Sequence, residues 1–218
     1  LRLMDESHFN HLLKSRNRKE KKELLLQVFY VFKQIFQPEM YNKDWSVMKM
    51  ATIHIILCSL QEFSLSLIND FLGDSKSQPN NAFDISLWNS FFNLSVSFLT
   101  QNALQLENFP ASKKESILEK YQDMRVLMGF LILSMWEKLG NHKVYFIPSM
   151  VAPFLEVTLV PKKELRKATL PIFYDMIDAE FKSDGSFKQV ESKLIDKLDI
   201  LVSENRGDDE FKQLFNAM

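Results

Sequence analysis

An all-helical fold is predicted by three features of this 218-residue chain. Glycine is scarce, with 5 residues, so neither glycine-rich phosphate loops nor a hairpin-dense β architecture is expected. Phenylalanine and methionine are abundant, with 19 and 10 residues, and such bulky side chains suit packing between helices. Apolar residues recur three and four positions apart, which is the period of a helix and not of a strand.

The helical period and its breakers define the expected elements in order. Helices are predicted over residues 19–36, 44–72, 84–105, 112–139, in two shorter stretches between 148 and about 182, over 186–202, and from 208 onward. With a further short helix around His8 and His11, this gives about eight or nine helices. Helices joined by short turns predict a solenoid of antiparallel pairs, although no strict period supports a named repeat such as the tetratricopeptide.

Capping residues predict where these helices start and stop. The expected N-caps are Asp44, Asp84, Ser186 and Asp208. Ser112, followed by Glu115 three residues later, predicts a capping box. Pro38, Gly73 and Gly140 are expected to end the helices that precede them.

Four prolines divide the stretch between 148 and 171. Pro148 and Pro161 are expected in first turns, where the missing N–H would have no helical partner. Pro153 and Pro171 predict kinks or breaks, because proline removes a hydrogen bond from a helix interior.

Composition narrows the classes of function. The net charge is −1, so no overall positive field draws the chain to nucleic acid. Cys58 is the only cysteine, which excludes an internal disulfide and fits a reducing, cytoplasmic compartment. Residues 85–106 are the best membrane-span candidate, but they carry too many polar side chains and predict a buried helix instead. The chain begins without Met and ends within an apolar pattern, so we expect a piece of a longer protein.

No catalytic, cofactor-binding or metal-binding residue is assigned from the sequence. His8 and His11, with Asp5 and Glu6 nearby, have a spacing that can share a metal, but a solvated helix face is the favoured interpretation. His54 and Cys58 lie in an apolar run and predict a core histidine and an inert buried thiol.

Four charged or motif-like segments have competing explanations. An all-helical enzyme would need an aspartate cluster on a helix face; residues 208–210 are instead explained by the dipole of a helix start. His142 is expected near free carbonyls at a helix end. The basic run from Lys14 to Lys22 could meet anionic lipid or serve as a nuclear signal, but a solvated lead into a helix is favoured. Residues 206–208 spell an integrin tripeptide and residues 93–95 a glycosylation sequon, and both are explained by local structure.

Longer segments carry a family resemblance. They run in order through residues 44–50 (DWSVMKM), 87–92 (LWNSFF), 98–101, 104–109 (LQLENF), 120–125 (KYQDMR), 142–148, 158–161, 165–173 (LRKATLPIF), 187–191 (FKQVE), 197–199 and 206–208. Together they resemble the dedicator-of-cytokinesis (DOCK) family of atypical guanine nucleotide exchange factors. The likeness is to the two Rac-activating subfamilies, one of which also acts on Rap, and it does not decide between them.

The resemblance implies a place in a larger protein. Residues 1–160 would belong to an armadillo-like, right-handed helical scaffold that follows a lipid-binding region, and residues 161–218 would lead into the first lobe of the exchange domain. The catalytic lobes and the dimer-forming helices would lie beyond residue 218. The parent would then bind a Rho-family GTPase, an ELMO-type adaptor and phosphoinositide membranes, act as a homodimer, and move from cytoplasm to membrane in cytoskeletal and cell-migration signalling.

Three functional hypotheses follow. The first is a non-catalytic scaffold that positions the lipid-binding and catalytic regions of an exchange factor. The second is an independent helical-repeat module that binds a helix or peptide of a partner. The third is an all-helical enzyme, which would need charged residues converging in one cavity.

Overall fold

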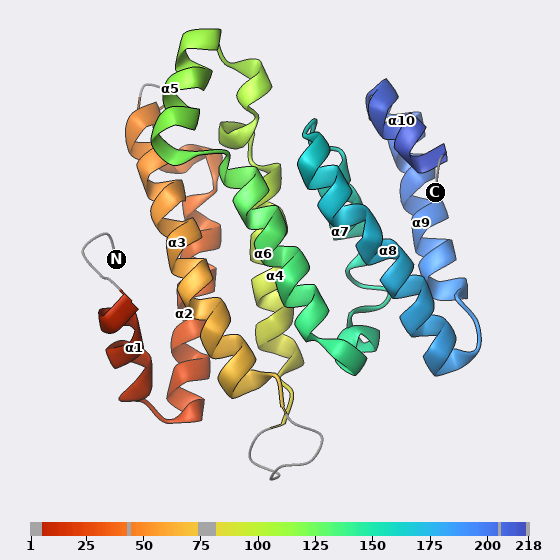
Figure 1. Cartoon of the computed structure of the whole chain (residues 1–218), viewed down its shortest axis with the longest axis horizontal. Helices are drawn as coiled ribbons and strands as arrows, with labels where there is room; N and C mark the ends of the chain where they lie inside the picture. The colour runs from red at the N-terminus through yellow and green to blue at the C-terminus, as the bar shows by residue number, and fades with distance from the viewer. Residues whose placement is uncertain (1–5, 43–44, 74–81, 205, 217–218) are drawn as a thin grey trace. The chain divides into compact units, whose positions relative to one another are not determined.

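The computed structural model describes residues 6–42, 45–73, 82–204 and 206–216. Within these residues the chain is all-helical and has no strand (Figure 1). The α-helices are α1 Glu6–Lys14, α2 Arg18–Ile35, α3 Ser46–Phe71, α4 Ile85–Thr100, α5 Ala111–Tyr121, α6 Met124–Lys138, α7 Val151–Thr158, α8 Lys163–Asp184, α9 Lys188–Ser203 and α10 Asp209–Asn216. In the described parts of the chain, four short 3-10 helices connect them: η1 Pro38–Met40, η3 Asn102–Leu104, η4 Leu106–Asn108 and η5 Gly140–Phe146. The all-α prediction is confirmed, while the handed solenoid stays a prediction.

The chain divides into two compact units, residues 1–124 and 125–218. The predicted boundary at residue 160 concerns the organisation of a longer protein and stays a prediction. Within the second unit, α7 and α8 pack together across that position.

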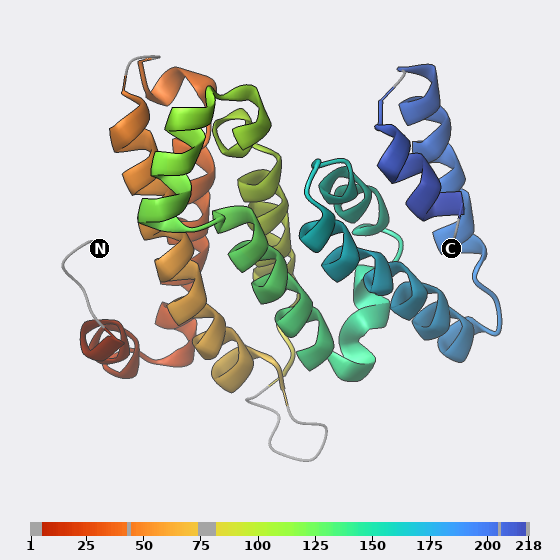
Figure 2. The ribbon, with the colours of Figure 1, turned by 45° about the horizontal axis from the view of Figure 1, so that its top comes forward.

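In the first unit, α2, α3 and α4 lie side by side, as both ribbon views show (Figure 1, Figure 2). Aromatic rings form the centre of their core: Phe29 meets Phe63 at 6.4 Å and Phe91 at 6.1 Å between ring centroids. The buried indole of Trp88 donates to the carbonyl of Phe71 at 3.2 Å, which ties the start of α4 to the end of α3. Burial of this ring cluster is the main stabilising term expected for the unit.

In the second unit, α8 contacts η5, α7 and α9. Trp136 of α6 is fully buried and lies edge-on to Phe154 of α7, with centroids 5.6 Å apart. Gly129 gives α6 a close approach to α8, because a Cβ there would lie 2.4 Å from Leu165 Cδ1. The sequence did not predict this contact.

Several helix ends match the prediction. Asp84 caps α4, since its Oδ1 accepts from the Leu87 N–H at 3.1 Å. Asp208 caps α10 in the same way, accepting from the Phe211 N–H at 2.7 Å. Gly73 and Gly140 follow α3 and α6 with positive φ angles of 73° and 52°. Asp44 lies outside the described residues.

The capping box at Ser112 and the single helix over 112–139 were wrong predictions. Helix α5 begins one residue earlier, with Pro110 as its cap and no side-chain cap bond. The carbonyl of Pro110 accepts from two N–H groups of the first turn, so Ser112 lies inside the helix. The chain then breaks at Gln122, whose φ is 58°, which separates α5 from α6.

The proline predictions were also wrong in detail. Pro148 follows a cis peptide bond in the turn before α7, and Pro161 precedes the N-cap of α8, so neither occupies a first turn. Pro153 lies in the first turn of α7 and breaks nothing. Pro171 lies inside α8, and the helix continues past it to Asp184. Pro171 is exposed, so water can bind the carbonyl four residues earlier, which has no N–H partner at Pro171.

Candidate functional site

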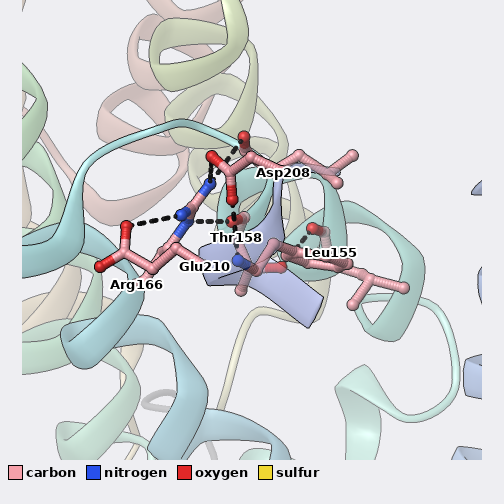
Figure 3. A network of polar contacts seen from close by, with 7 residues as sticks. Leu155, Thr158, Arg166, Asp208 and Glu210 are labelled. Carbon is pink, nitrogen blue, oxygen red and sulfur yellow. Dashed lines mark hydrogen bonds and ion pairs between the residues drawn. The ribbon is translucent and has the colours of Figure 1, made fainter. Parts of the chain in front are cut away.

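The second unit contains a buried arginine that joins three helices (Figure 3). Arg166 of α8 is 1% exposed. Its Nε donates to the carbonyl of Thr158 at 2.9 Å and its Nη2 to the carbonyl of Leu159 at 3.4 Å, at the C-terminal end of α7. Its Nη2 also pairs with Asp208 at 2.8 Å, and its Nη1 pairs with Glu210 at 3.0 Å. One guanidinium therefore caps α7 and anchors the start of α10.

The surroundings of Asp208 explain its ionisation. The hydrogen bond from Arg166 and the N–H of Phe211 stabilise the carboxylate, and together they outweigh the cost of partial burial. The pKa of Asp208 is consequently lowered. The acidic run at residues 208–210 thus serves a structural ion pair as well as the helix dipole that the sequence predicted.

Glu156 of α7 forms a second ion-pair cluster. It binds Lys197 of α9 at 2.5 Å and Arg206, in the segment before α10, at 2.8 Å. Burial acts to raise the pKa of Glu156, but the hydrogen bonds from Lys197 and Arg206 outweigh it, and the pKa is lowered. Arg206 and Asp208, the charged residues of the integrin-like tripeptide, are both engaged within the unit.

Glu180 is a buried carboxylate that caps a neighbouring helix. It lies in α8, is 2% exposed, and accepts from the main-chain N–H groups of Gln189 and Val190 at 2.9 Å each. These are N–H groups of the first turn of α9, which has no side-chain cap of its own. The prediction that Ser186 caps this helix was wrong, because a carboxylate from the preceding helix takes that role.

Three of the six residues of the basic run contact neighbouring helices inside the first unit. Arg18 donates to the carbonyl of Asp70 at 3.0 Å and lies over the ring of Phe71. Lys21 pairs with the Asp70 carboxylate at 2.9 Å, and Lys22 pairs with Asp84 at 2.6 Å. These side chains fasten the start of α2 to the end of α3 and the start of α4. The prediction that the basic run is a solvent-exposed segment leading into the helix was therefore wrong for these three residues.

The start of α2 has a capping box that the sequence analysis missed. Asn17 Oδ1 accepts from the Glu20 N–H at 3.0 Å, and Glu20 accepts from the Asn17 N–H at 3.1 Å. The signal was present in the spacing of Asn17 and Glu20.

The histidines and the cysteine do not form one cluster, although Cys58 and His54 are neighbours on α3. His8 and His11 are exposed on α1, and Asp5 lies outside the described residues. No group of three or more His, Cys, Asp or Glu side chains that could hold a metal occurs in the described part of the chain. Cys58 is exposed rather than buried, because its position on α3 faces away from the aromatic core. Its Sγ lies 3.9 Å from Nε2 of His54, one turn earlier, so the prediction of an isolated buried thiol was wrong.

His54 and His142 stack on tyrosines. His54 is only partly buried, with its ring centroid 5.2 Å from that of Tyr121, so it is not a core histidine. His142 in η5 stacks on Tyr145 at 5.9 Å. Desolvation lowers the pKa of His142, which favours the neutral ring over the cation predicted at that helix end.

Among the described residues, one helix has the length and composition to cross a membrane. It is α3, Ser46–Phe71, and half of the residues in its most apolar stretch are buried inside the chain. A core helix passes the same criterion, so this is weak evidence for a span. Residues 85–106, for which the sequence predicts a buried helix rather than a span, form a helix only as far as Thr100, over 16 residues. Asn93 and Ser95 of the sequon lie within α4, as expected, and Ser95 is fully buried.

The fold and its polar clusters define an all-helical protein whose identified charges serve helix packing. A family model described as the dedicator of cytokinesis (DOCK) TPR region matches residues 1–218. The chain belongs to this family, as the resemblance predicted. The family description names a tetratricopeptide-type region, whereas the sequence has no strict repeat period that would have predicted one.

Curated relatives support the same assignment. Dedicator of cytokinesis protein 4 from Homo sapiens is 48% identical over 219 residues, and protein 3 from Homo sapiens is 45% identical over 219 residues. Both alignments cover 100% of this chain but only 11% and 10% of the relatives. The chain therefore spans about a tenth of the length of these proteins.

Proposed function

We propose that this chain is a non-catalytic helical scaffold segment of a guanine nucleotide exchange factor for the Rho-family GTPase Rac or for Rap. In this proposal it holds a lipid-binding region and a catalytic region at a set separation in cytoskeletal and cell-migration signalling. The single observation that carries the proposal is the family match over the whole chain. The exchange chemistry, the GTPase, the ELMO-type adaptor, the phosphoinositide membrane and the homodimer are proposed for the parent protein.

The polar clusters support a mechanical role. Arg166 and Glu180 each join one helix to the start or end of another, and Glu156 joins α7 to α9 and to the segment before α10. Cross-helix contacts at helix ends oppose sliding of neighbouring helices, and a stack of helices shares a continuous core. Such a stack can therefore keep the regions attached to its two ends at a fixed separation.

Nucleotide exchange by the isolated chain tests the non-catalytic half of the proposal. Residues 1–218 are mixed with Rac loaded with a fluorescent GDP analogue, and release is followed with excess unlabelled GTP. We expect the GDP analogue to leave Rac at the rate measured without this chain. EDTA, which accelerates nucleotide release, is the positive control. Accelerated release by this chain alone would refute the proposal.

Replacement of the segment tests the scaffold half. In the parent protein, residues 1–218 are exchanged for a flexible Gly/Ser linker of similar end-to-end reach. We expect exchange on soluble Rac to be unchanged, while exchange on Rac anchored to phosphoinositide vesicles falls. Equal rates on vesicles would show that the segment does not set the separation.

An independent interaction module is the second candidate, and exposed apolar residues on α9 favour it. Ile195 and Val202 lie two turns apart and are 52% and 76% exposed. A partner that covers them would bind residues 1–218 in a stoichiometric complex and fail to bind the Val202→Asp variant. The scaffold proposal instead expects that variant to retain all partners of this chain.

A further inference from the structure

A small cavity lies between the start of α3 and α5 in the first unit. Met50 of α3 and Ile117 of α5 form its floor and are 3% and 7% exposed, while Val47 is 70% exposed at its edge. Tyr121 lines the same cavity. The floor is therefore apolar and preformed, and one wall is open to a partner.

The volume of the cavity restricts what can fill it. It measures about 170 Å³, below the roughly 300–1,000 Å³ of sites that enclose small-molecule ligands. A single leucine or phenylalanine side chain from another polypeptide fits this space better than a cofactor does. The floor offers that side chain an apolar environment.

Two lysines at the edge give the cavity its charge. Lys113 and Lys120 both line it, and no acidic residue does. Their ammonium groups lie over the rings of Phe109 and Tyr121, at 4.5 Å and 5.3 Å from the centroids. Neither has an ion-pair partner among the residues that the structure describes. With respect to the described residues, both can therefore bind carboxylates without losing an ion pair.

The spacing of the lysines defines the pattern that a partner needs. Residues 113 and 120 are seven positions apart on α5, which is two turns or about 10.5 Å along the helix. Two carboxylates seven positions apart on a partner helix would have the same separation. A residue three or four positions after the first carboxylate would face the cavity between them.

We propose that the α3–α5 cavity is a docking site for an acidic amphipathic helix of a partner protein. One large apolar side chain enters the cavity, and acidic residues at i and i+7 pair with Lys113 and Lys120. This interaction is separate from nucleotide exchange, so its failure would leave the scaffold proposal untouched.

A pair of fluorescein-labelled helical peptides tests the proposal against the whole 218-residue chain. The first peptide carries Glu at positions i and i+7 with Leu at i+3, and the second carries Lys in place of both Glu residues. Fluorescence anisotropy should show saturable binding of the acidic peptide and at least about tenfold weaker binding of the basic one. Absence of saturable binding of the acidic peptide would overturn the proposal.

Charge reversal locates the interaction. Lys113→Glu/Lys120→Glu should weaken binding of the acidic peptide by about tenfold and should strengthen binding of the basic peptide. The matched control is Lys19→Glu/Lys114→Glu, which changes the same net charge at one exposed and one half-buried position, neither of which lines the cavity. Equal losses in both double variants would show a non-specific charge effect and would overturn the proposal.

Filling the cavity tests the apolar half independently. Ser116→Phe places a ring at an exposed position that lines the cavity. We expect weaker peptide binding at an unchanged thermal midpoint, and unchanged binding would overturn the cavity as the anchor. Co-sedimentation with phosphatidylserine vesicles, abolished by the lysine reversal while the acidic peptide fails to bind, would assign the surface to lipid instead.

Discussion

Glu180 on α8 accepts a hydrogen bond from the main-chain N–H of Val190 on α9 at 2.9 Å, and both residues are buried. The same carboxylate accepts from the N–H of Gln189. A helix start normally takes its cap from the residue just before it. Here the cap comes from the preceding helix, so the turn between α8 and α9 and the packing of the two helices depend on one side chain.

Removal of this cap should destabilise the second unit. In Glu180→Ala, two N–H groups of the α9 start lose their acceptor, at least one of them buried, and the expected loss in unfolding free energy is about 2–3 kcal/mol. Glu180→Gln keeps one acceptor oxygen and should lose less, about 1 kcal/mol. Urea unfolding followed by circular dichroism measures both. The exposed Glu191→Gln serves as the control, and a loss of equal size there would contradict the capping role.

Arg166 should control the docking of α10. Arg166→Met removes the donors to the Thr158 carbonyl, Asp208 and Glu210, and we expect a loss of about 2–3 kcal/mol. The two carboxylates are 45% and 44% exposed, so solvent reduces the cost of leaving them unpaired. Arg166→Lys should not rescue fully, because an ammonium lacks the planar fork of donors. Hydrogen exchange of the α10 amides should rise in both variants, and unchanged protection would contradict this role.

Acid should destabilise the chain through three carboxylates. The folded pKa values of Asp84, Glu156 and Asp208 are all lowered. The stability from these groups is therefore present above their unfolded pKa values, about 3.9 for Asp and 4.3 for Glu, and is lost as pH falls through the folded values. Urea midpoints should decline below about pH 4.5. Glu156→Gln should show a shallower decline, and an identical slope would remove Glu156 as a contributor.

Gly129 should not tolerate alanine. A Cβ at this position would lie 2.4 Å from Leu165 Cδ1, and Leu165 is 1% exposed. Alanine favours a helix over glycine by about 1 kcal/mol, but overlap in a packed core costs about 1–3 kcal/mol, so Gly129→Ala should be net destabilising. Thermal unfolding measures the change. Leu165→Val in the same chain should recover part of the loss, and additive losses in the double variant would contradict the overlap.

Cys58 should react with a thiol reagent in the folded protein, but slowly at neutral pH. The side chain is exposed, while partial desolvation and the charge of Glu62 raise the pKa of the thiol. The thiolate fraction at pH 7 is therefore lower than in a free cysteine peptide, and the rate should climb as pH rises toward and above 9. Reaction with dithionitrobenzoate measures this. A rate at pH 7 above that of the peptide would contradict the raised pKa.

The sequence alone predicted most elements, because helical periodicity is a local signal. The Asp84 cap and the Asp208 cap followed from residue type and spacing. The capping prediction at Ser112 was wrong for a physical reason: its spacing to Glu115 met the rule, but the N-cap of α5 is Pro110, two residues earlier. The break between α5 and α6 at Gln122 could not be predicted from the sequence, because no glycine or proline lies there.

For the charged clusters, the sequence shows that the charged residues are present, but it does not show which of them are buried or which partners they bind. Arg166 and Glu180 look like ordinary polar positions of a surface helix, yet both are buried. Their partners lie 42 and 10 residues away in the chain, at Asp208 and Val190. Burial and partner choice arise from how α7, α8, α9 and α10 pack, and no local pattern contains that information.

The sequence by itself determined the all-helical class, the approximate helix positions and the family, because period, capping chemistry and ordered family segments are read along the chain. Only the tertiary structure decided which charges are buried, that α9 is capped by Glu180, and that half of the basic run holds α2 to α3 and α4. These depend on distances between residues far apart in sequence. Burial raises the cost of an unpaired charge, so packing selects the partner that each charge must have.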